Sequence, residues 1–480
     1  MPSHPFAKTV TAVLCAAALA GCALSPPGPP AAPRLPASWS APLPHGGEAS
    51  QLGQWWSQFD DPDLPDLIDA AQREHGSLAQ AAARIAEARA NLRASGGAAL
   101  PQLDAVASAN RGKSLAVVPA SLLSTTTSVG LDARWEIDLF GRTRNQVAAA
   151  SARADAAVTS WHSARVSLAA EVAATFVGYR ACEALVRVYD EDSRSQSRTA
   201  ELTRLKVGAG FETPANGALA TASAADAASR RAAQQAECDV LVKSLVALTA
   251  VDEPALRTRL ASRSAQVAQP AAFVVAQVPA QWLAQRPDLA GLEYEVAAAS
   301  ADIGAAQAER YPRLSLSGTI AAATLGFAGA TTRGTNWSLG PALSLPLFDG
   351  GRRAANVDAA RARYDQARAA YTQRVKDAVR EVEEALVRLD AAARRESDAR
   401  RAAQGYREFF GAAQARWEIG VGSLLDLEDA RRLTLAADAG VINLQRERVA
   451  AWIALYKAVG GGWDTHAPHA WQVSEIEAGK

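Results

Sequence analysis

Residues that could carry catalysis are sparse in this chain and stand at spacings that favour no known chemistry. His466 and His469 fall in a polar stretch near the end of the sequence, where a solvated tail is the simpler interpretation. Gly208-x-Gly210 lacks the third glycine and the preceding strand that a dinucleotide site requires, so we interpret it as a helix break. The sequence therefore predicts no enzyme, no metal site and no cofactor.

Composition and charge argue against nucleic-acid binding as the function of this chain. The 480 residues carry 50 basic and 50 acidic side chains, so no net charge favours nucleic acid as a partner.

Three carboxylates lie close together at Glu381, Glu383 and Glu384, and we interpret them as the solvated face of a helix. Alanine supplies about half of the hydrophobic content of 49%, so large aliphatic residues are correspondingly few.

Two of the four cysteines lie level with each other in a predicted helical hairpin. Cys182 lies 28 residues before Gly210, and Cys238 lies 28 residues after it. They could pair in an oxidising compartment. Helix axes normally pack about 8 to 10 Å apart, whereas a disulfide needs Cα atoms within about 7 Å. We therefore expect two packed thiols, and a bond only if alanine-rich helices approach closely.

The N-terminal 21 residues have the pattern of a signal peptide, since an apolar run from Val10 to Ala20 is too short to span a bilayer. Leu19-Ala20-Gly21-Cys22 resembles a bacterial lipobox, which implies a lipid such as palmitate on Cys22; the alternative is an ordinary signal peptide. Residues 22–62 are then expected to form a Pro-rich tether. No later stretch has the ~20 consecutive apolar residues of a spanning helix.

Two stretches alternate between apolar and polar residues with the period of a β-strand, Val129 to Leu139 and Trp337 to Leu347. Each runs into a long alanine-rich helix. A strand with one charged and one apolar face that leads into a helix suggests a membrane barrel mounted on helices. The charged residues of the first stretch, which we predict to face the lumen, are Asp132, Arg134, Glu136 and Asp138.

The order of elements repeats after about 210 residues, which indicates an internal duplication. We expect repeats over 63–275 and 276–463 and a polar tail over 464–480. Helices are predicted over 64–95, 142–207, 214–250, 352–419 and 423–459, with another ending at 309, loops over 111–124 and 326–336, and irregular structure over 252–279. The matching pairs are Leu100-Pro101 with Tyr311-Pro312, Phe140-Gly141 with Phe348-Asp349, and Gly208-x-Gly210 with Gly420-x-Gly422.

Weaker alternation predicts two further strands, one from Leu100 to about Asn110 and one that begins near Leu314. Four strands are too few to close a barrel, so the barrel must be shared between copies. Two copies would give about eight strands, whose interior side chains fill, whereas three give about twelve and leave room for water. The charged inner face favours the larger, water-filled barrel made by three copies. We therefore predict a mainly α protein with a β-barrel contribution, assembled as a homotrimer with a 12-stranded barrel and an α-helical tunnel.

Five stretches resemble the outer-membrane efflux channels similar to TolC, in the lipoprotein branch typified by OprM and NodT. The resemblance spans Trp55 to Trp463 and implies a duct in the outer membrane of a Gram-negative bacterium. It also implies an inner-membrane RND-type pump and a periplasmic adaptor, which deliver drugs and other small molecules. The stretches are W-W-x-x-F-D-D-P-D-L from Trp55, W-E-I-D-L-F-G-R from Trp135, Q-R-P-D-L from Gln285, A-S-A-D-I-G-A-A from Ala299 and L-Y-K-A-V-G-G-G-W from Leu455.

The same resemblance implies a periplasmic gate at Leu425, Asp429 and Arg432. These residues stand at i, i+4 and i+7 after the Gly420 turn and so share one helix face. Without the resemblance, Asp429 and Arg432 would be interpreted as an exposed ion pair. The first repeat has Thr213 and Gly217 in place of Leu425 and Asp429, and is expected to narrow the mouth less.

Two other functions remain open at this point. The same fold could form the exit duct of a type I protein-secretion system. A helical structural lipoprotein would explain the lipobox and the helices, but it leaves the two alternating strands unexplained. The transported substrates, the pump and adaptor that the duct serves, the state of Cys182 and Cys238 and the state of the gate are not decided by the sequence.

Overall fold

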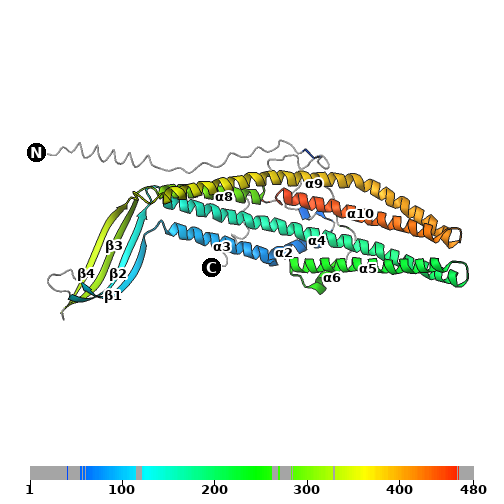
Figure 1. Cartoon of the computed structure of the whole chain (residues 1–480), viewed down its shortest axis with the longest axis horizontal. Helices are drawn as coiled ribbons and strands as arrows, with labels where there is room; N and C mark the ends of the chain where they lie inside the picture. Colours follow the sequence, from blue (N-terminus) through cyan, green and yellow to red (C-terminus); the bar gives the residue numbers. More distant parts are fainter. Residues whose placement is uncertain are drawn as a thin grey trace. The chain divides into compact units, whose positions relative to one another are not determined.

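The computed structural model describes residues 40–41, 55–56, 58–59, 61–114, 122–261, 267, 269–270, 283, 285–327, 330–461 and 463. Cys22, His466 and His469 lie outside these residues. The elements of Figure 1 are α2 (Asp63–Glu74), α3 (Gly76–Gly97), β1 (Gln102–Ser114), β2 (Leu122–Ile137), α4 (Arg142–Gly208), α5 (Pro214–Thr249), α6 (Glu253–Ala261), α8 (Pro287–Ala308), β3 (Arg313–Phe327), β4 (Ala330–Ser344), α9 (Arg352–Glu418) and α10 (Leu424–Ala458).

The described chain forms two compact units, each built from both sequence repeats. The strand unit includes Ala83–Val158 and Gly291–Gln373, and therefore holds all four strands. The hairpin unit includes Thr159–Ala290 and the chain from Arg374 onward, together with the segment that contains α2. Among the described helices, none is both long and apolar enough to cross a membrane.

In the strand unit, the four strands form one antiparallel sheet in the order β1-β2-β3-β4 (Figure 1). The strands are longer than predicted, because β1 reaches Ser114, β2 begins at Leu122, β3 reaches Phe327 and β4 begins at Ala330. The expected loops over 111–124 and 326–336 are therefore too long. Small and polar residues, including Arg111 and Lys113 at the end of β1, fill most of these strand ends, so the apolar alternation fades although backbone pairing continues.

At the opposite end of the sheet, β2 and β4 end before the predicted Leu139 and Leu347. A residue just beyond each of these strands caps the helix that follows. Asp138 Oδ2 accepts the Arg144 backbone N–H at 2.8 Å at the start of α4, and Asp349 Oδ2 accepts the Arg353 backbone N–H at 3.2 Å at the start of α9. Helix capping by a carboxylate therefore competes with strand extension at both junctions.

Two helical hairpins, α4–α5 and α9–α10, dominate the hairpin unit. Each turn contains a glycine with positive φ, 76° at Gly210 and 83° at Gly420. Thr213 Oγ1 then accepts the Asn216 N–H at 3.2 Å, and Ser423 caps α10 in the same way. The two turns therefore correspond with a spacing of 210 residues, so the expected match of Gly208 with Gly420 is wrong.

The turn ends of the two hairpins pack together within the hairpin unit. Their buried cluster consists of Ala220, Trp417, Leu424 and Leu427, and Ala200, Leu202 and Phe410 pack against it. At the other end of α10, Trp55 stacks on Trp452 with ring centroids 4.2 Å apart, and both rings are almost wholly buried. The W-W motif near the start of the chain is therefore part of the core of this unit.

Two helix predictions need correction. The helix expected over 64–95 is interrupted at His75, whose extended backbone separates α2 from α3. The region over 252–279, expected to be irregular, contains α6, whose Leu256 and Leu260 are fully buried. A nine-residue helix is too short to show a clear apolar period in the sequence.

Candidate functional site

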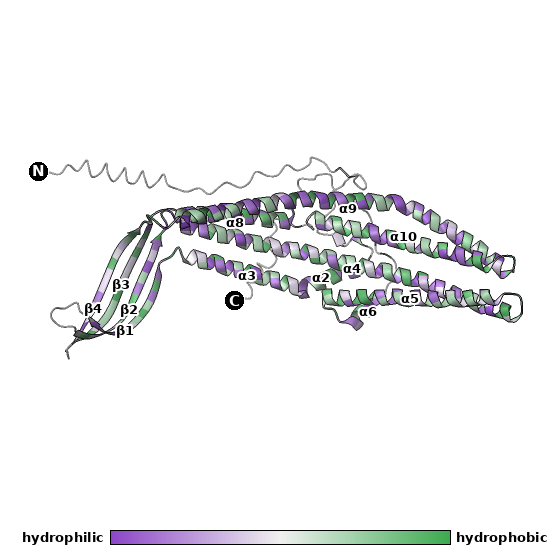
Figure 2. Cartoon of the chain, in the orientation of Figure 1, coloured by the Kyte–Doolittle hydropathy of each residue, from purple (hydrophilic) through white to green (hydrophobic). Residues whose placement is uncertain are grey.

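The sheet presents one apolar and one polar face. In its middle, Leu131 lies opposite Ile320, which in turn lies opposite Trp337. The adjacent row is Asp132, Thr319 and Ser338. Directly opposed residues of an antiparallel sheet lie on the same face, so the two rows belong to opposite faces. Figure 2 shows hydrophilic and hydrophobic residues alternating along these strands.

The four charged residues predicted to face the lumen have different environments. Asp132 and Arg134 lie within β2, on the polar face of the sheet. Glu136 lies on the same face, and its carboxylate accepts hydrogen bonds from Arg142 Nε at 3.0 Å and Nη2 at 2.8 Å. Asp138, expected within the strand, lies beyond its end and caps α4. The lumenal role of all four remains a prediction.

The residues predicted to form the gate lie on an exposed face of α10. Leu424 and Leu427 are buried, whereas Leu425 is 62% exposed. Arg432 Nη2 donates to Asp429 Oδ1 at 3.0 Å, and their side chains are 76% and 55% exposed. The structure therefore brings Asp429 and Arg432 together as an i, i+3 ion pair, with Leu425 one turn closer to the hairpin turn.

The opposite face of α10 is joined to α4 by buried polar contacts that the sequence did not reveal. Arg431 Nη2 donates to Thr199 Oγ1 at 2.9 Å, and Gln196 Nε2 donates to Glu428 Oε2 at 2.7 Å. These residues alternate with the exposed pair along α10. Contacts with α4 therefore fix the direction in which Asp429 faces.

The α4–α5 turn lacks an equivalent set of gate residues. The 210-residue spacing of the turns makes Thr213 the counterpart of the cap Ser423, so Thr213 and Gly217 are not the counterparts of Leu425 and Asp429. The residues that correspond to Leu425, Asp429 and Arg432 are Ala215, Leu219 and Ala222. The first repeat therefore offers neither charge of the pair at this level.

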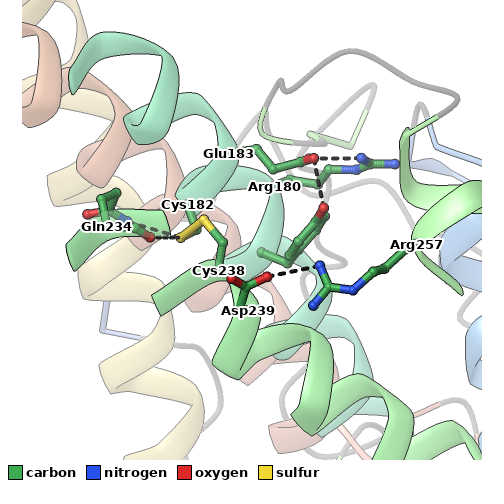
Figure 3. Close-up of a disulfide and its surroundings, with 8 residues drawn as sticks. Arg180, Cys182, Glu183, Gln234, Cys238, Asp239 and Arg257 are labelled. Atoms are coloured by element: carbon green, nitrogen blue, oxygen red, sulfur yellow. Dashed lines mark hydrogen bonds and ion pairs between the residues drawn. A yellow bond between two sulfur atoms is a disulfide. The ribbon is translucent and has the colours of Figure 1, made fainter. Parts of the chain in front are cut away.

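Cys182 of α4 and Cys238 of α5 form a disulfide, with Cα atoms 5.6 Å apart (Figure 3). The expectation of two packed thiols is wrong, because the alanine-rich helices approach closely enough for the bond. The two residues are 4% and 3% exposed. Gln234 Nε2 also donates a hydrogen bond to Cys182 Sγ at 3.0 Å. The cross-link therefore lies within the packed hairpin.

Removing this cross-link should destabilise the hairpin unit. The disulfide joins residues 56 positions apart, and bonds that close loops of this size stabilise proteins by about 2 to 4 kcal/mol. We expect the Cys182→Ser/Cys238→Ser variant to melt at a lower temperature in far-UV circular dichroism. Dithiothreitol should lower the melting temperature of the parent protein but not that of the variant. Equal melting of both proteins without reductant would contradict the prediction.

Arg180 of α4 forms one of two buried ion networks in the hairpin unit. Its side chain is fully buried and lies 3.2 Å from Asp61, 3.4 Å from Asp63 and 3.0 Å from Glu183, measured between nitrogen and oxygen. It also donates to the Leu260 carbonyl at 2.9 Å. The side chain thus joins α4 to the start of α2 and to the end of α6. This network was not predicted from the sequence; the signal that could have found it is a single arginine whose helical neighbours Phe176, Val177 and Ala184 are apolar.

Arg286, just before α8, forms the second network. Its Nη2 lies 2.7 Å from Asp288 and 2.9 Å from Glu381 of α9, and its Nη1 donates to the Ala458 carbonyl at 2.6 Å. Burial alone would raise the pKa of both carboxyls, but hydrogen bonds and charges from Arg286 and Arg374 outweigh it and lower both pKa values. The network ties α8, α9 and α10 together.

The interpretation of Glu381, Glu383 and Glu384 as a solvated face is therefore wrong for two of the three residues. Glu381 belongs to the Arg286 network, and the Glu383 carboxylate accepts the backbone N–H groups of Ser40 and Ala41 at 2.6 and 2.8 Å. Glu384 is exposed and pairs with the neighbouring Arg380. Spacing on α9 could not reveal partners that come from distant segments.

Comparisons with known proteins agree with this architecture. A family model described as "Outer membrane efflux protein" matches the chain twice, over residues 67–251 and 278–461. The chain is 32% identical to outer membrane protein OprJ of Pseudomonas aeruginosa, over 95% of this chain and 96% of that protein. It is 30% identical to the toluene efflux pump outer membrane protein TtgI of Pseudomonas putida, over 93% and 96% of the two chains.

A solved structure of the outer-membrane channel OprN superposes with a TM-score of 0.81, at 28% identity over 91% of this chain and 99% of that one. The mainly helical fold with a small antiparallel sheet is thereby confirmed. The relatives place the protein in the outer membrane of a Gram-negative bacterium. This chain belongs to the outer membrane efflux protein family.

Proposed function

We propose that this protein is the outer-membrane exit duct of a tripartite efflux system for drugs and other small molecules. An inner-membrane RND-type pump and a periplasmic adaptor deliver the substrates, and the duct performs no chemistry. The observation that carries the proposal is the sheet with one apolar and one polar face, whose strands lead directly into long helices. The efflux functions in the names of TtgI and similar relatives support it.

The duct is a homotrimer in this proposal. The described sheet leaves β1 and β4 as its two edges. Unpaired strand edges are unfavourable in a bilayer, and three copies of four strands close one barrel of twelve. The polar face with Asp132, Arg134 and Glu136 then lines the water-filled lumen. A lipid on Cys22 adds one further anchor to the membrane.

The adaptor docks at the hairpin turns. Large apolar side chains at these turns are strongly exposed, including Phe211 at 83%, Ile419 at 76% and Val421 at 66%. Grouped exposed apolar residues of this kind mark surfaces that bind another protein. Both turns carry such residues, so the adaptor contacts both repeats.

Leu425, Asp429 and Arg432 narrow the periplasmic mouth of the trimer. Three copies of Asp429 around one axis would repel one another, and Arg432, 3.0 Å away in the same copy, offsets this charge. Replacing Asp429 and Arg432 with alanine should widen the mouth and raise the single-channel conductance of the purified trimer in a planar bilayer. Unchanged conductance of an intact trimer would count against the gate.

The matched control for this prediction is another exposed ion pair with the same spacing. Asp398 and Arg401 of α9 also stand at i, i+3, with side chains 70% and 79% exposed. The Asp398→Ala/Arg401→Ala variant removes the same charges away from the mouth, so its conductance should equal that of the parent protein.

The test of the function itself is genetic. Cells that lack this gene should become sensitive to solvents, dyes or antibiotics, and deletion of the partner pump should produce the same spectrum. Unchanged sensitivity together with loss of a secreted protein would instead assign the duct to protein secretion.

A further inference from the structure

Phe348 and Leu347, which follow β4, are the most exposed large apolar residues of the described chain, at 93% and 90%. They lie in the strand unit, in the connection between β4 and α9. Full exposure of an aromatic ring to water is unfavourable, because burying such a side chain stabilises by about 1.5 to 3 kcal/mol. A specific partner surface is therefore expected at this position.

The first repeat shows what the corresponding phenylalanine contacts. Phe140 follows β2 and stacks on Tyr311, which precedes β3, with ring centroids 4.9 Å apart. The contact arises because β2 pairs with β3 in antiparallel register. A phenylalanine after the second strand of one repeat thus meets a large apolar residue before the first strand of the next repeat.

The second repeat has the corresponding phenylalanine and a large apolar residue before the first strand of the chain, but these two residues are not in contact within one copy. Phe348 follows β4, and Leu100, which precedes β1, is the counterpart of Tyr311: each lies two residues before its strand. Leu100 is also 63% exposed. The strands beside these residues, β4 and β1, are the two edges of the sheet. Within one copy, β2 and β3 separate them.

The strand faces agree with a contact between Phe348 and Leu100. Alternation along β4 puts Ser344 and Phe348 in the same phase, and alternation along β1 does the same for Leu100 and Asp104. Asp104 pairs with Asp132 on the polar face, and Ser344 pairs with Arg313 in the row that continues from Ser315 and Glu136. Both apolar residues lie beyond the strand ends, but counted in steps of two they are in phase with the same face of the sheet, as Phe140 is with Glu136 and Tyr311 with Arg313.

We infer that Phe348 packs against Leu100 of a second copy of this chain, and so repeats between copies the Phe140–Tyr311 contact within a copy. The inference rests on the proposed trimer, in which β4 of each copy adjoins β1 of the next. It assigns a second task to the β4–α9 connection. This connection seals the junction between copies where the sheet meets the helices.

Cysteine cross-linking tests the contact. The Leu100→Cys/Phe348→Cys variant, oxidised in detergent, should give covalent dimers and trimers on denaturing gels, whereas either single variant should remain monomeric. Phe140→Cys/Tyr311→Cys is the matched control, which should link within one copy and run as a monomer. The native Cys182–Cys238 bond is buried and should not interfere. A trimer that forms in mild detergent without cross-links would overturn the contact but leave the proposed trimer intact.

A photoreactive benzophenone amino acid at position 348 provides an independent measurement that keeps an aromatic side chain. Mass spectrometry after illumination should find it attached near Leu100 of another copy. Attachment to phospholipid would show that Phe348 faces the membrane, and attachment within the same chain would show a local contact; either result overturns the inference. A protein that forms no trimer at all would overturn both the inference and the proposed assembly.

Discussion

Replacing Leu131 with arginine should remove most of the assembled trimer, whereas the same replacement at the neighbouring Asp132 should leave trimer yield close to that of the parent. Leu131 lies near the middle of β2 on the apolar face. Arginine on the lipid face near the bilayer midplane costs about 2 to 4 kcal/mol. A trimer carries three such residues, so the cost per barrel is about three times larger.

The two variants form a matched pair because they differ by one position in one strand. Asp132 lies on the polar face, where water solvates an arginine side chain. Trimer is measured as the slow-migrating band on mild-detergent gels, relative to total protein by immunoblot. If Asp132→Arg lost as much trimer as Leu131→Arg, the assignment of a lipid face and a lumenal face would be wrong.

Replacing Arg180 with methionine should lower the free energy of unfolding of the hairpin unit by about 3 to 5 kcal/mol, because it leaves the buried Asp61 carboxylate without its cation, whereas Asp63 keeps Arg259 at 2.7 Å. The side chains of Asp61 and Asp63 are only 7% and 10% exposed, so water cannot substitute for the guanidinium. We expect the melting temperature in far-UV circular dichroism to fall, and the starting segment of α2 to become more sensitive to protease.

Arg194 supplies the control on the same helix. It pairs with Asp190 at 2.7 Å, but its own side chain is 79% exposed. Exposed pairs of this kind contribute about 0 to 1 kcal/mol. Arg194→Met should therefore melt close to the parent protein. Similar melting of the two variants would show that the Arg180 network does not hold α4 to α2.

The sequence predicted the elements of the fold wherever a helical pattern continues over many residues. The helices α4, α5, α9 and α10 fall within one or two residues of their predicted bounds. A helical pattern that continues over so many residues fits no other element. The outer ends of the strands, above all of β2 and β4, were missed, since pairing between backbones extends past the residues that alternate. The short α6 was missed because one apolar stripe of two leucines carries too little signal.

At the candidate sites, sequence reasoning succeeded for contacts within one helix and failed for contacts between segments. The Asp429–Arg432 pair follows from helical spacing alone. The disulfide depended on the distance between two helix axes, which residue spacing leaves undetermined. Glu381 and Arg286 meet only because separate helices converge. No pattern along a single helix identifies such a partner.

The equal lengths of α4 and α9 restrict how this protein can evolve. Each helix has 67 residues between its strand and its turn. A single inserted residue in one helix would rotate everything beyond it by about 100° and advance the turn by ~1.5 Å. The turn cluster around Trp417 and Leu427 joins both hairpins and would then lose its fit. Insertions and deletions are therefore expected to accumulate in pairs, at matching depths in the two halves of the gene.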